Sequence, residues 1–171
     1  ENFNLKKMYG NNYGYRTGLN SSMVNHIEKK MKFLKKKVKI TDGDIIVDIG
    51  SNDGTLLKCF DHNKNELIGV DPTISKFKKY YPKEIKKVAN FFSKKNLNKN
   101  LKERKVKLIT SIAMFYDLPD PISFAKDIYN LLDDEGIWHL EQSYSGHMLK
   151  NLSYDTICHE HLEYYSLKSI K

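Results

Sequence analysis

The sequence predicts an α/β fold in which a parallel β-sheet carries helices on both faces. Short apolar segments rich in β-branched residues have the length of buried strands, at 44–49, 66–70, 107–112 and 136–141. Helical patterns lie before or between them, at 21–34 and 121–132. Because strands that alternate with helices form βαβ units, the sheet is expected to be parallel and covered on both sides. The 171 residues suit one domain.

The chain begins with an irregular segment followed by an amphipathic helix. Residues 9–19 place three tyrosines among three glycines, which predicts a loop with aromatic side chains to position. The next helix has apolar residues on one face, namely Met23, Val24, Ile27, Met31 and Leu34. Lys29, Lys30, Lys32 and Lys35 to Lys37 lie outside this face, so we expect that side of the helix to face solvent.

The later elements alternate between strand and helix. The strand at 44–49 runs into a glycine-rich turn and then into a helical stretch at 55–60. The strand at 66–70 ends at Asp71-Pro72, because proline favours leaving a strand at the residue before it. A weaker strand is expected at 86–90.

Composition and charge exclude several classes of protein. The apolar segments of the chain are far shorter than the roughly 20 residues that cross a bilayer, so no membrane span is expected. The formal charge of +8 could indicate nucleic-acid binding, but the lysines are spread along the chain and mixed with Asn, which argues against that partner. A small substrate that carries a diphosphate would also suit a basic surface. Cys59 and Cys158 stand alone, and the chain shows no secretory leader, so we expect a reducing cytoplasm.

A glycine turn, Asp48-Ile-Gly50-Ser-Asn-Asp-Gly54, joins the first strand to the following helix. Ligands of open α/β sheets bind beyond the carboxyl ends of the strands, where Asp71 could accept hydrogen bonds from both hydroxyls of a ribose. A P-loop would need a Lys after its last Gly, and a dinucleotide fingerprint would need a Gly in place of Asn52. The turn therefore predicts a nucleoside site of another kind.

The remaining pattern, D-x-G-x-x-x-G with a carboxylate after the next strand, resembles the first motifs of class I S-adenosylmethionine (SAM) methyltransferases. The resemblance implies a Rossmann-like methyltransferase sheet and SAM as cofactor, with Asp48 near the methionine ammonium and Asp71 on the ribose. The expected cofactor-binding residues are Asp48, Gly50, Asn52, Gly54, Asp71, Asn90 and Ser111. The alternative is a glycine turn that only joins two elements, and for Asn90 a plain turn residue.

Residues 154–165 concentrate titratable and aromatic side chains around His159-Glu160-His161. In an extended segment the two histidines would point to one face and Glu160 to the other. They could be metal ligands, core-edge histidines bonded to backbone carbonyls, or a general base, for which the near-neutral pKa of His is suited. A metal would need at least one further ligand, and no second His or Cys pair stands nearby, so we predict no metal site.

Several motifs, which span nearly the whole chain in order, together resemble the sugar C-methyltransferase family. They are Tyr13-Gly-Tyr-Arg-Thr-Gly, the glycine turn, Phe115-Tyr-Asp-Leu-Pro-Asp-Pro, Glu141-Gln-Ser-Tyr and Tyr154-Asp-Thr-Ile-Cys-His-Glu-His. Members of that family methylate a ring carbon of nucleotide-linked keto-deoxysugars through an enolate. The resemblance implies His161 as the base, Glu160 as its orienting group, His159 in the same cleft and Tyr13 near the enolate oxygen. Cys158 departs from members that have Tyr there.

The family also has an amino-terminal zinc domain and a carboxyl-terminal sugar-binding domain, and neither is visible in this sequence. We therefore expect residues 1–20 to lead into a partial SAM-binding core at 21–171, which ends before the last strands of a complete methyltransferase sheet. Alternative functions are an O-methyltransferase on a small molecule and a non-catalytic SAM-binding or nucleic-acid-binding module.

Overall fold

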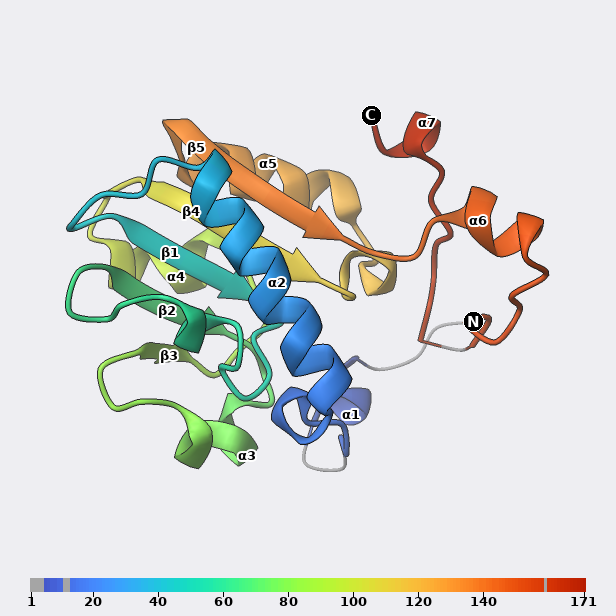
Figure 1. Cartoon of the computed structure of the whole chain (residues 1–171), viewed down its shortest axis with the longest axis horizontal. Coiled ribbons are helices and arrows are strands. Elements are labelled where there is room, and N and C mark those ends of the chain that lie inside the picture. Colours follow the sequence, from blue (N-terminus) through green and yellow to red (C-terminus); the bar gives the residue numbers. More distant parts are fainter. Residues whose placement is uncertain (1–4, 11–12, 159) are drawn as a thin grey trace.

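A five-stranded parallel sheet, in the order β3-β2-β1-β4-β5, forms the centre of the fold (Figure 1). The computed structural model describes residues 5–10, 13–158 and 160–171. The strands are β1 (Ile45–Ile49), β2 (Glu66–Val70), β3 (Lys86–Val88), β4 (Val106–Ile112) and β5 (Leu132–Glu141). The chain moves outward in one direction from β1 to β3 and then crosses to β4, so the strand order reverses beside β1.

The carboxyl ends of the three central strands lie at one level. Ile49, the last residue of β1, pairs with Val70 at the end of β2 and with Ser111 near the end of β4. An open α/β sheet has its ligand crevice where the strand order reverses. The topology therefore places the candidate site just beyond Ile49.

Helices cover both faces of the sheet, as the alternating pattern predicts. Helix α2 (Ser21–Lys37) crosses one face, while α4 (Lys94–Leu101) and α5 (Pro121–Leu131) cover the other (Figure 1). Side chains of β1 alternate between the two: Ile46 belongs to the core under α2, and Val47 to the core under α4 and α5. Both faces are thus sealed by apolar packing.

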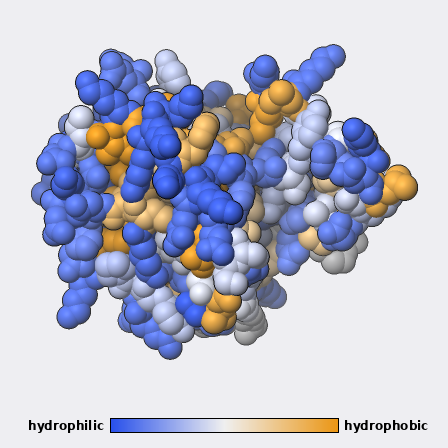
Figure 2. Space-filling model, in the orientation of Figure 1, coloured by the Kyte–Doolittle hydropathy of each residue, from blue (hydrophilic) through white to orange (hydrophobic). Residues whose placement is uncertain are grey.

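Helix α2 shows how its sequence determines its position. The side chain of Asn20 caps its first turn by accepting a hydrogen bond from the Met23 amide, at 3.2 Å. Ile27, Met31 and Leu34 recur at helical spacing and are buried against the sheet. The lysines turn outward, and Figure 2 shows mostly hydrophilic side chains over this side of the molecule.

Shorter helices complete the described part of the chain. They are α1 (Leu5–Met8), η1 (Thr17–Leu19), η2 (Leu57–Cys59), α3 (Ile74–Phe77), η3 (Lys78–Tyr80), η4 (Phe115–Asp117), α6 (Ser145–Lys150) and α7 (Leu167–Ile170). The helical stretch expected at 55–60 is present in shorter form: the amides of Cys59 and Phe60 bond to carbonyls three residues back, so Leu57–Cys59 forms a 3₁₀ helix and not a longer α-helix. In the described residues, no helix combines the length and apolarity that crossing a membrane requires.

The carboxylate of Asp53 fixes the turn after β1 to the amino-terminal segment. Its side chain is fully buried, and Oδ2 accepts hydrogen bonds from Arg16 Nη1 and the Gly18 amide, both at 3.0 Å. Oδ1 accepts from the amide and hydroxyl of Thr55, at 3.2 and 2.6 Å. The guanidinium of Arg16 also stacks over the ring of Tyr80, 4.0 Å from its centroid.

Asn52 adds a second attachment for the same segment. Its Oδ1 accepts from the Thr17 amide at 2.9 Å, and its Nδ2 donates to the Tyr15 carbonyl at 3.1 Å. Two adjacent side chains of one turn therefore hold residues 15–18 beside the carboxyl end of β1.

Replacing Asp53 by Ala should strongly destabilise the protein. The change leaves the Gly18 amide and Arg16, whose side chain is 16% exposed, without their acceptor, and breaking a buried ion pair costs about 3–5 kcal/mol, which sets the upper end for this partly buried pair. Urea unfolding measures the loss. The matched control is Glu135→Gln, which removes the exposed ion pair with Lys107 and should change the free energy of unfolding by about 0.5 kcal/mol or less. Equal losses in the two variants would refute the attachment.

Candidate active site

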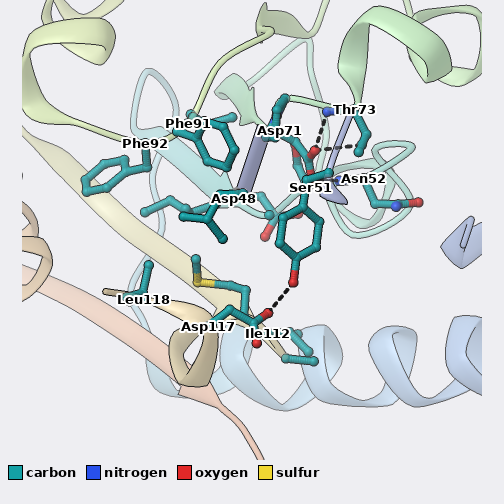
Figure 3. A pocket seen from close by; sticks show the side chains of 18 of the residues that line it. Asp48, Ser51, Asn52, Asp71, Thr73, Phe91, Phe92, Ile112, Asp117 and Leu118 are labelled. Carbon is teal, nitrogen blue, oxygen red and sulfur yellow. Dashed lines mark hydrogen bonds between the residues drawn. The ribbon is translucent and has the colours of Figure 1, made fainter. Parts of the chain in front are cut away.

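A cavity of about 720 Å³ lies beyond the carboxyl ends of β1, β2 and β4. Its size is typical of sites for small molecules. The described lining comes from the amino-terminal segment, α2, the turn after β1, the end of β2, residues 91–93, residues 112–114 and 116–120, α5 and the pair Glu160 and His161. Figure 3 shows Asp48 and Asp71 in one part of this cavity and Asp117 in another.

The glycine turn brings main chain to the cavity surface. Gly50 has φ +74°, and a Cβ there would lie 3.2 Å from Met114 Cγ. Asn52 also takes a left-handed φ, +48°, which Asn tolerates better than most residues. Gly54 lies outside the cavity lining, and a Cβ at that position would meet the Tyr81 ring at 2.7 Å. Gly54 therefore serves the packing of the turn.

Asp48 presents a buried carboxyl group to the cavity. Its Oδ1 accepts a hydrogen bond from Thr110 Oγ1 at 2.7 Å. Burial raises the pKa of Asp48 to about 7, and the negative charge of Asp71 acts in the same direction, whereas the hydrogen bond from Thr110 lowers the pKa. A cationic group in the cavity would therefore find here a carboxylate that burial has made costly to leave unpaired.

Asp71 is largely occupied by its own loop. Oδ1 accepts from the amide and hydroxyl of Thr73, at 2.7 and 2.6 Å, and Oδ2 accepts from the Asn52 amide at 2.9 Å (Figure 3). A carboxylate has about four acceptor positions, so one remains for a ligand. The expected pair of hydrogen bonds to two ribose hydroxyls is thereby reduced to one.

Asn90 follows β3 and Ser111 lies near the end of β4, but neither side chain lines the cavity. Asn90 is exposed, and its Oδ1 accepts from the Phe91 amide at 2.8 Å. Ser111 is fully buried, and its Oγ accepts from Trp138 Nε1 at 2.8 Å. The cavity is lined instead by Phe91 and Phe92, which offer aromatic surfaces. Position in the chain predicted the right neighbourhood but not the direction of these side chains.

The second part of the cavity is rich in tyrosine and carboxylate. Tyr9, Tyr13, Tyr116 and Asp117 line it, and Tyr9 Oη donates to Asp117 Oδ2 at 2.6 Å. Burial, with smaller contributions from nearby acidic groups, raises the pKa of Tyr13 to about 12. Its hydroxyl is therefore protonated at neutral pH and can donate a hydrogen bond to an oxyanion.

His161 is oriented by the backbone. Its Nδ1 lies 2.6 Å from the Thr156 carbonyl oxygen. Since a carbonyl only accepts, Nδ1 carries the proton, and Nε2 of the neutral ring is free to accept one. The ring also packs on Tyr116, with centroids 4.2 Å apart. The orienting hydrogen bond expected from Glu160 is thus made by Thr156.

The segment around His161 turns where an extended chain was expected. The His161 amide bonds to the Cys158 carbonyl at 3.3 Å, so Glu160 does not alternate away, and both Glu160 and His161 line the cavity. His159 lies outside the described residues. The Tyr116 carbonyl accepts from the amides of Leu162 and Glu163, at 2.9 and 3.2 Å, which holds the segment against the turn after β4.

Sequence reasoning did not identify two carboxylates of this region. Asp53 binds the amino-terminal segment, and Asp117 lies beside His161 in the lining. Both stood inside motifs that carried the family resemblance, but their partners, Arg16 and Tyr9, are 37 and 108 positions away in the sequence. No local pattern indicates such pairings.

Comparisons with known proteins agree on the fold. A model of the family described as "Methyltransferase domain" matches residues 23–171. The chain is 28% identical over 159 residues to the C-methyltransferase NovU of Streptomyces niveus, covering 92% of this chain and 38% of that relative. The chain therefore spans well under half of the relative's length.

Solved structures with the same fold include two methyltransferase systems. One is a complex of the Haloferax volcanii Trm112 methyltransferase activator with a methyltransferase, matched at TM-score 0.68 and 16% identity over 90% of this chain and 68% of that chain. Another is the plantazolicin methyltransferase BpumL with a triazolic desmethylPZN analog and SAH, matched at TM-score 0.61 and 17% identity over 85% and 56%. At these identities the likeness concerns the fold alone.

Asp48→Asn should make stability less dependent on pH. The pKa of Asp48 is about 7 in the folded protein and 3.8 for an ordinary Asp, so between pH 4 and 7 only the unfolded chain loses this proton. The wild-type free energy of unfolding therefore falls as pH rises through that window and is steady above it. Urea unfolding measures the free energy of unfolding of the variant minus that of the wild type, and this difference should rise from pH 4.5 to pH 7.5. The exposed control, Asp42→Asn, should show no such rise. A difference that is the same at both pH values would contradict the burial effect.

Proposed function

Because the chain belongs to the methyltransferase-domain family, we propose that it binds SAM in this cavity and methylates a ring carbon of a nucleotide-linked keto-deoxysugar. One observation carries the proposal: an oriented histidine, His161, shares a cavity with Asp48, Gly50 and Asp71 of the strand ends. The similarity to a C-methyltransferase supports transfer to carbon.

The cavity has the groups that SAM needs. Asp48 offers a buried carboxylate to the methionine ammonium, and Asp71 keeps one acceptor position for a ribose hydroxyl. Gly50 leaves its main chain uncovered on the cavity side, and Phe91 and Phe92 offer flat apolar surface for an adenine ring. When bound, SAM supplies an electrophilic methyl group on a sulfonium centre.

The second part of the cavity would form the nucleophile. Nε2 of His161 takes the proton from the carbon beside the keto group, and the electron pair moves into an enolate. The neutral hydroxyl of Tyr13 donates a hydrogen bond to the enolate oxygen. Glu160 and Asp117 hold negative charge near the imidazolium that results. The enolate carbon would then form its bond to the methyl group as the bond from that methyl group to the sulfonium sulfur breaks, with the electron pair of the broken bond left on sulfur. His161 finally returns its proton to water.

The charges of the lining agree with a neutral sugar ring in the cavity. Among the described residues, the lining includes six acidic side chains and neither Lys nor Arg: Asp48, Asp71, Asp117, Asp120, Asp127 and Glu160. Phosphate groups would be repelled there. The nucleotide diphosphate is therefore expected to remain outside, toward the basic surface.

Asp71→Ala should weaken SAM binding by about 1–3 kcal/mol, the scale of a lost hydrogen bond to a charged group. Isothermal calorimetry measures the change. Because Asp71 also holds Thr73, the control is Thr73→Val, which removes one internal hydrogen bond but keeps the carboxylate position open to the ligand. We expect a much smaller loss from the control. An Asp71→Ala variant with wild-type affinity would remove Asp71 from the site.

Deuterium exchange tests the carbon chemistry apart from methyl transfer. In D₂O with S-adenosylhomocysteine bound, the wild type should exchange the hydrogen beside the keto group of dTDP-4-keto-6-deoxyglucose, as read by NMR. His161→Asn should slow this exchange and turnover by roughly 10²- to 10⁴-fold, the usual contribution of a general base, and leave SAM affinity unchanged.

The same measurement separates the rival chemistries. Methyl transfer without exchange in the wild type would favour an O-methyltransferase. If His161→Asn still exchanges at the wild-type rate, another residue is the base, and His159→Asn is the next variant to measure.

A further inference from the structure

The carboxylate of Asp117 has one oxygen that is hydrogen-bonded within the protein and one that has no partner among the described residues. Oδ2 accepts a hydrogen bond from Tyr9 Oη at 2.6 Å, which is the dashed line that ends at Asp117 in Figure 3. Oδ1 is shielded from solvent and makes no hydrogen bond to the described part of the chain. The residue is 9% exposed and lines the cavity.

An unpartnered buried carboxylate oxygen has a free-energy cost, because most buried polar atoms in folded proteins are hydrogen-bonded. The cost also appears in the pKa of Asp117, which burial raises to about 6 despite the hydrogen bond from Tyr9 and the nearby His161. Such an arrangement is typical of an atom that completes its hydrogen bonds only when a ligand is bound.

The place of Asp117 identifies what that ligand atom would adjoin. Asp117 is the last residue of η4, and the ring of the preceding residue, Tyr116, packs on the His161 ring. The Tyr116 carbonyl accepts hydrogen bonds from the amides of Leu162 and Glu163. The unpaired oxygen and the His161 ring therefore belong to the same wall of the cavity. A group bound at Asp117 would adjoin the carbon that His161 deprotonates.

The partner of Oδ1 must be a donor, because an ionised carboxylate only accepts hydrogen bonds. The described lining contains no Lys or Arg that could move in to supply one. Within the proposed function, the donors of a keto-deoxysugar ring are its hydroxyl groups.

We propose that Asp117 Oδ1 accepts a hydrogen bond from a ring hydroxyl of the sugar and thereby makes that hydroxyl a requirement for methylation. The proposal rests on the proposed function. It makes Asp117 a specificity-determining residue of the acceptor site, held in position by Tyr9. A site built to bond a hydroxyl discriminates strongly against an analogue that lacks it, because its buried acceptor is then left unpaired.

The test compares dTDP-4-keto-6-deoxyglucose with its 2-deoxy and 3-deoxy counterparts. For the wild type, kcat/KM should be roughly 10²-fold lower with one of the two deoxy sugars than with the parent sugar. Leu is close in size to Asp but cannot accept a hydrogen bond, so in Asp117→Leu the ratio of kcat/KM between the parent sugar and that deoxy sugar should fall to near unity. Asp117→Asn should retain part of this ratio, since an amide can still bond a hydroxyl. The Asn variant serves as the test if the Leu variant does not fold.

Asp120→Asn is the matched control. Asp120 is an exposed carboxylate three positions along the same lining, where it caps α5, and Asn preserves the cap while removing the charge. This variant should keep the wild-type preference for the hydroxyl-bearing sugar.

Each outcome has a distinct meaning. The proposal is supported if Asp117→Leu loses the preference for the hydroxyl-bearing sugar and Asp120→Asn keeps it. Methyl transfer with the preference unchanged in Asp117→Leu, or with no preference in the wild type, overturns the role of Asp117 and leaves the proposed function standing. No wild-type transfer to any of the three sugars overturns both.

Discussion

Four hydrogen bonds to the buried carboxylate of Asp53 determine whether the cavity has its amino-terminal wall. A carboxylate can be fully buried only where donors compensate its lost hydration. Two of the donors, on Arg16 and Gly18, belong to a segment far upstream. If that segment detached from the turn, the buried carboxylate of Asp53 would lose two of its hydrogen bonds. Tyr13 and Tyr15 reach the cavity because this constraint holds the residues that directly follow them beside the strand ends.

The turn after β4 has the corresponding role at the other side of the cavity. Its residues bond to both outlying segments: Asp117 to Tyr9, and the Tyr116 carbonyl to the amides at 162 and 163. The sheet contributes rigid strand ends, and the segments outside it contribute most of the titratable side chains near the proposed acceptor. In the proposed function, cofactor and acceptor would therefore be bound by different parts of one cavity wall.

The sheet could be predicted from sequence because the signals of buried strands are local. The segment 66–70 matches β2 at both ends, and the glycine turn lies where the pattern placed it. Asn52 shows where local reasoning ends. It counted as a mismatch to glycine, yet it adopts a left-handed φ and bonds to Tyr15 and Thr17, partners that no local pattern reveals.

Side-chain direction was harder to predict than side-chain location. Ser111 lies on the strand that ends at the cavity, but its side chain points to Trp138 in the core. His161 was expected in an extended segment, and a tight turn brings Glu160 to the same side. In each case a tertiary contact, with the tryptophan or with the turn after β4, decided the outcome.

The hydrogen bond between Tyr9 and Asp117 joins residues 108 positions apart, which places the cavity late in the order of folding. The entropy lost on closing a loop grows with its length, so neighbouring strands such as β1 and β2 can pair while the outer segments are still unattached. A ligand that touches both outer segments binds only the completed fold and stabilises it by mass action. Occupancy by the proposed acceptor, which would contact both outlying segments, would thus report that these segments have reached the sheet.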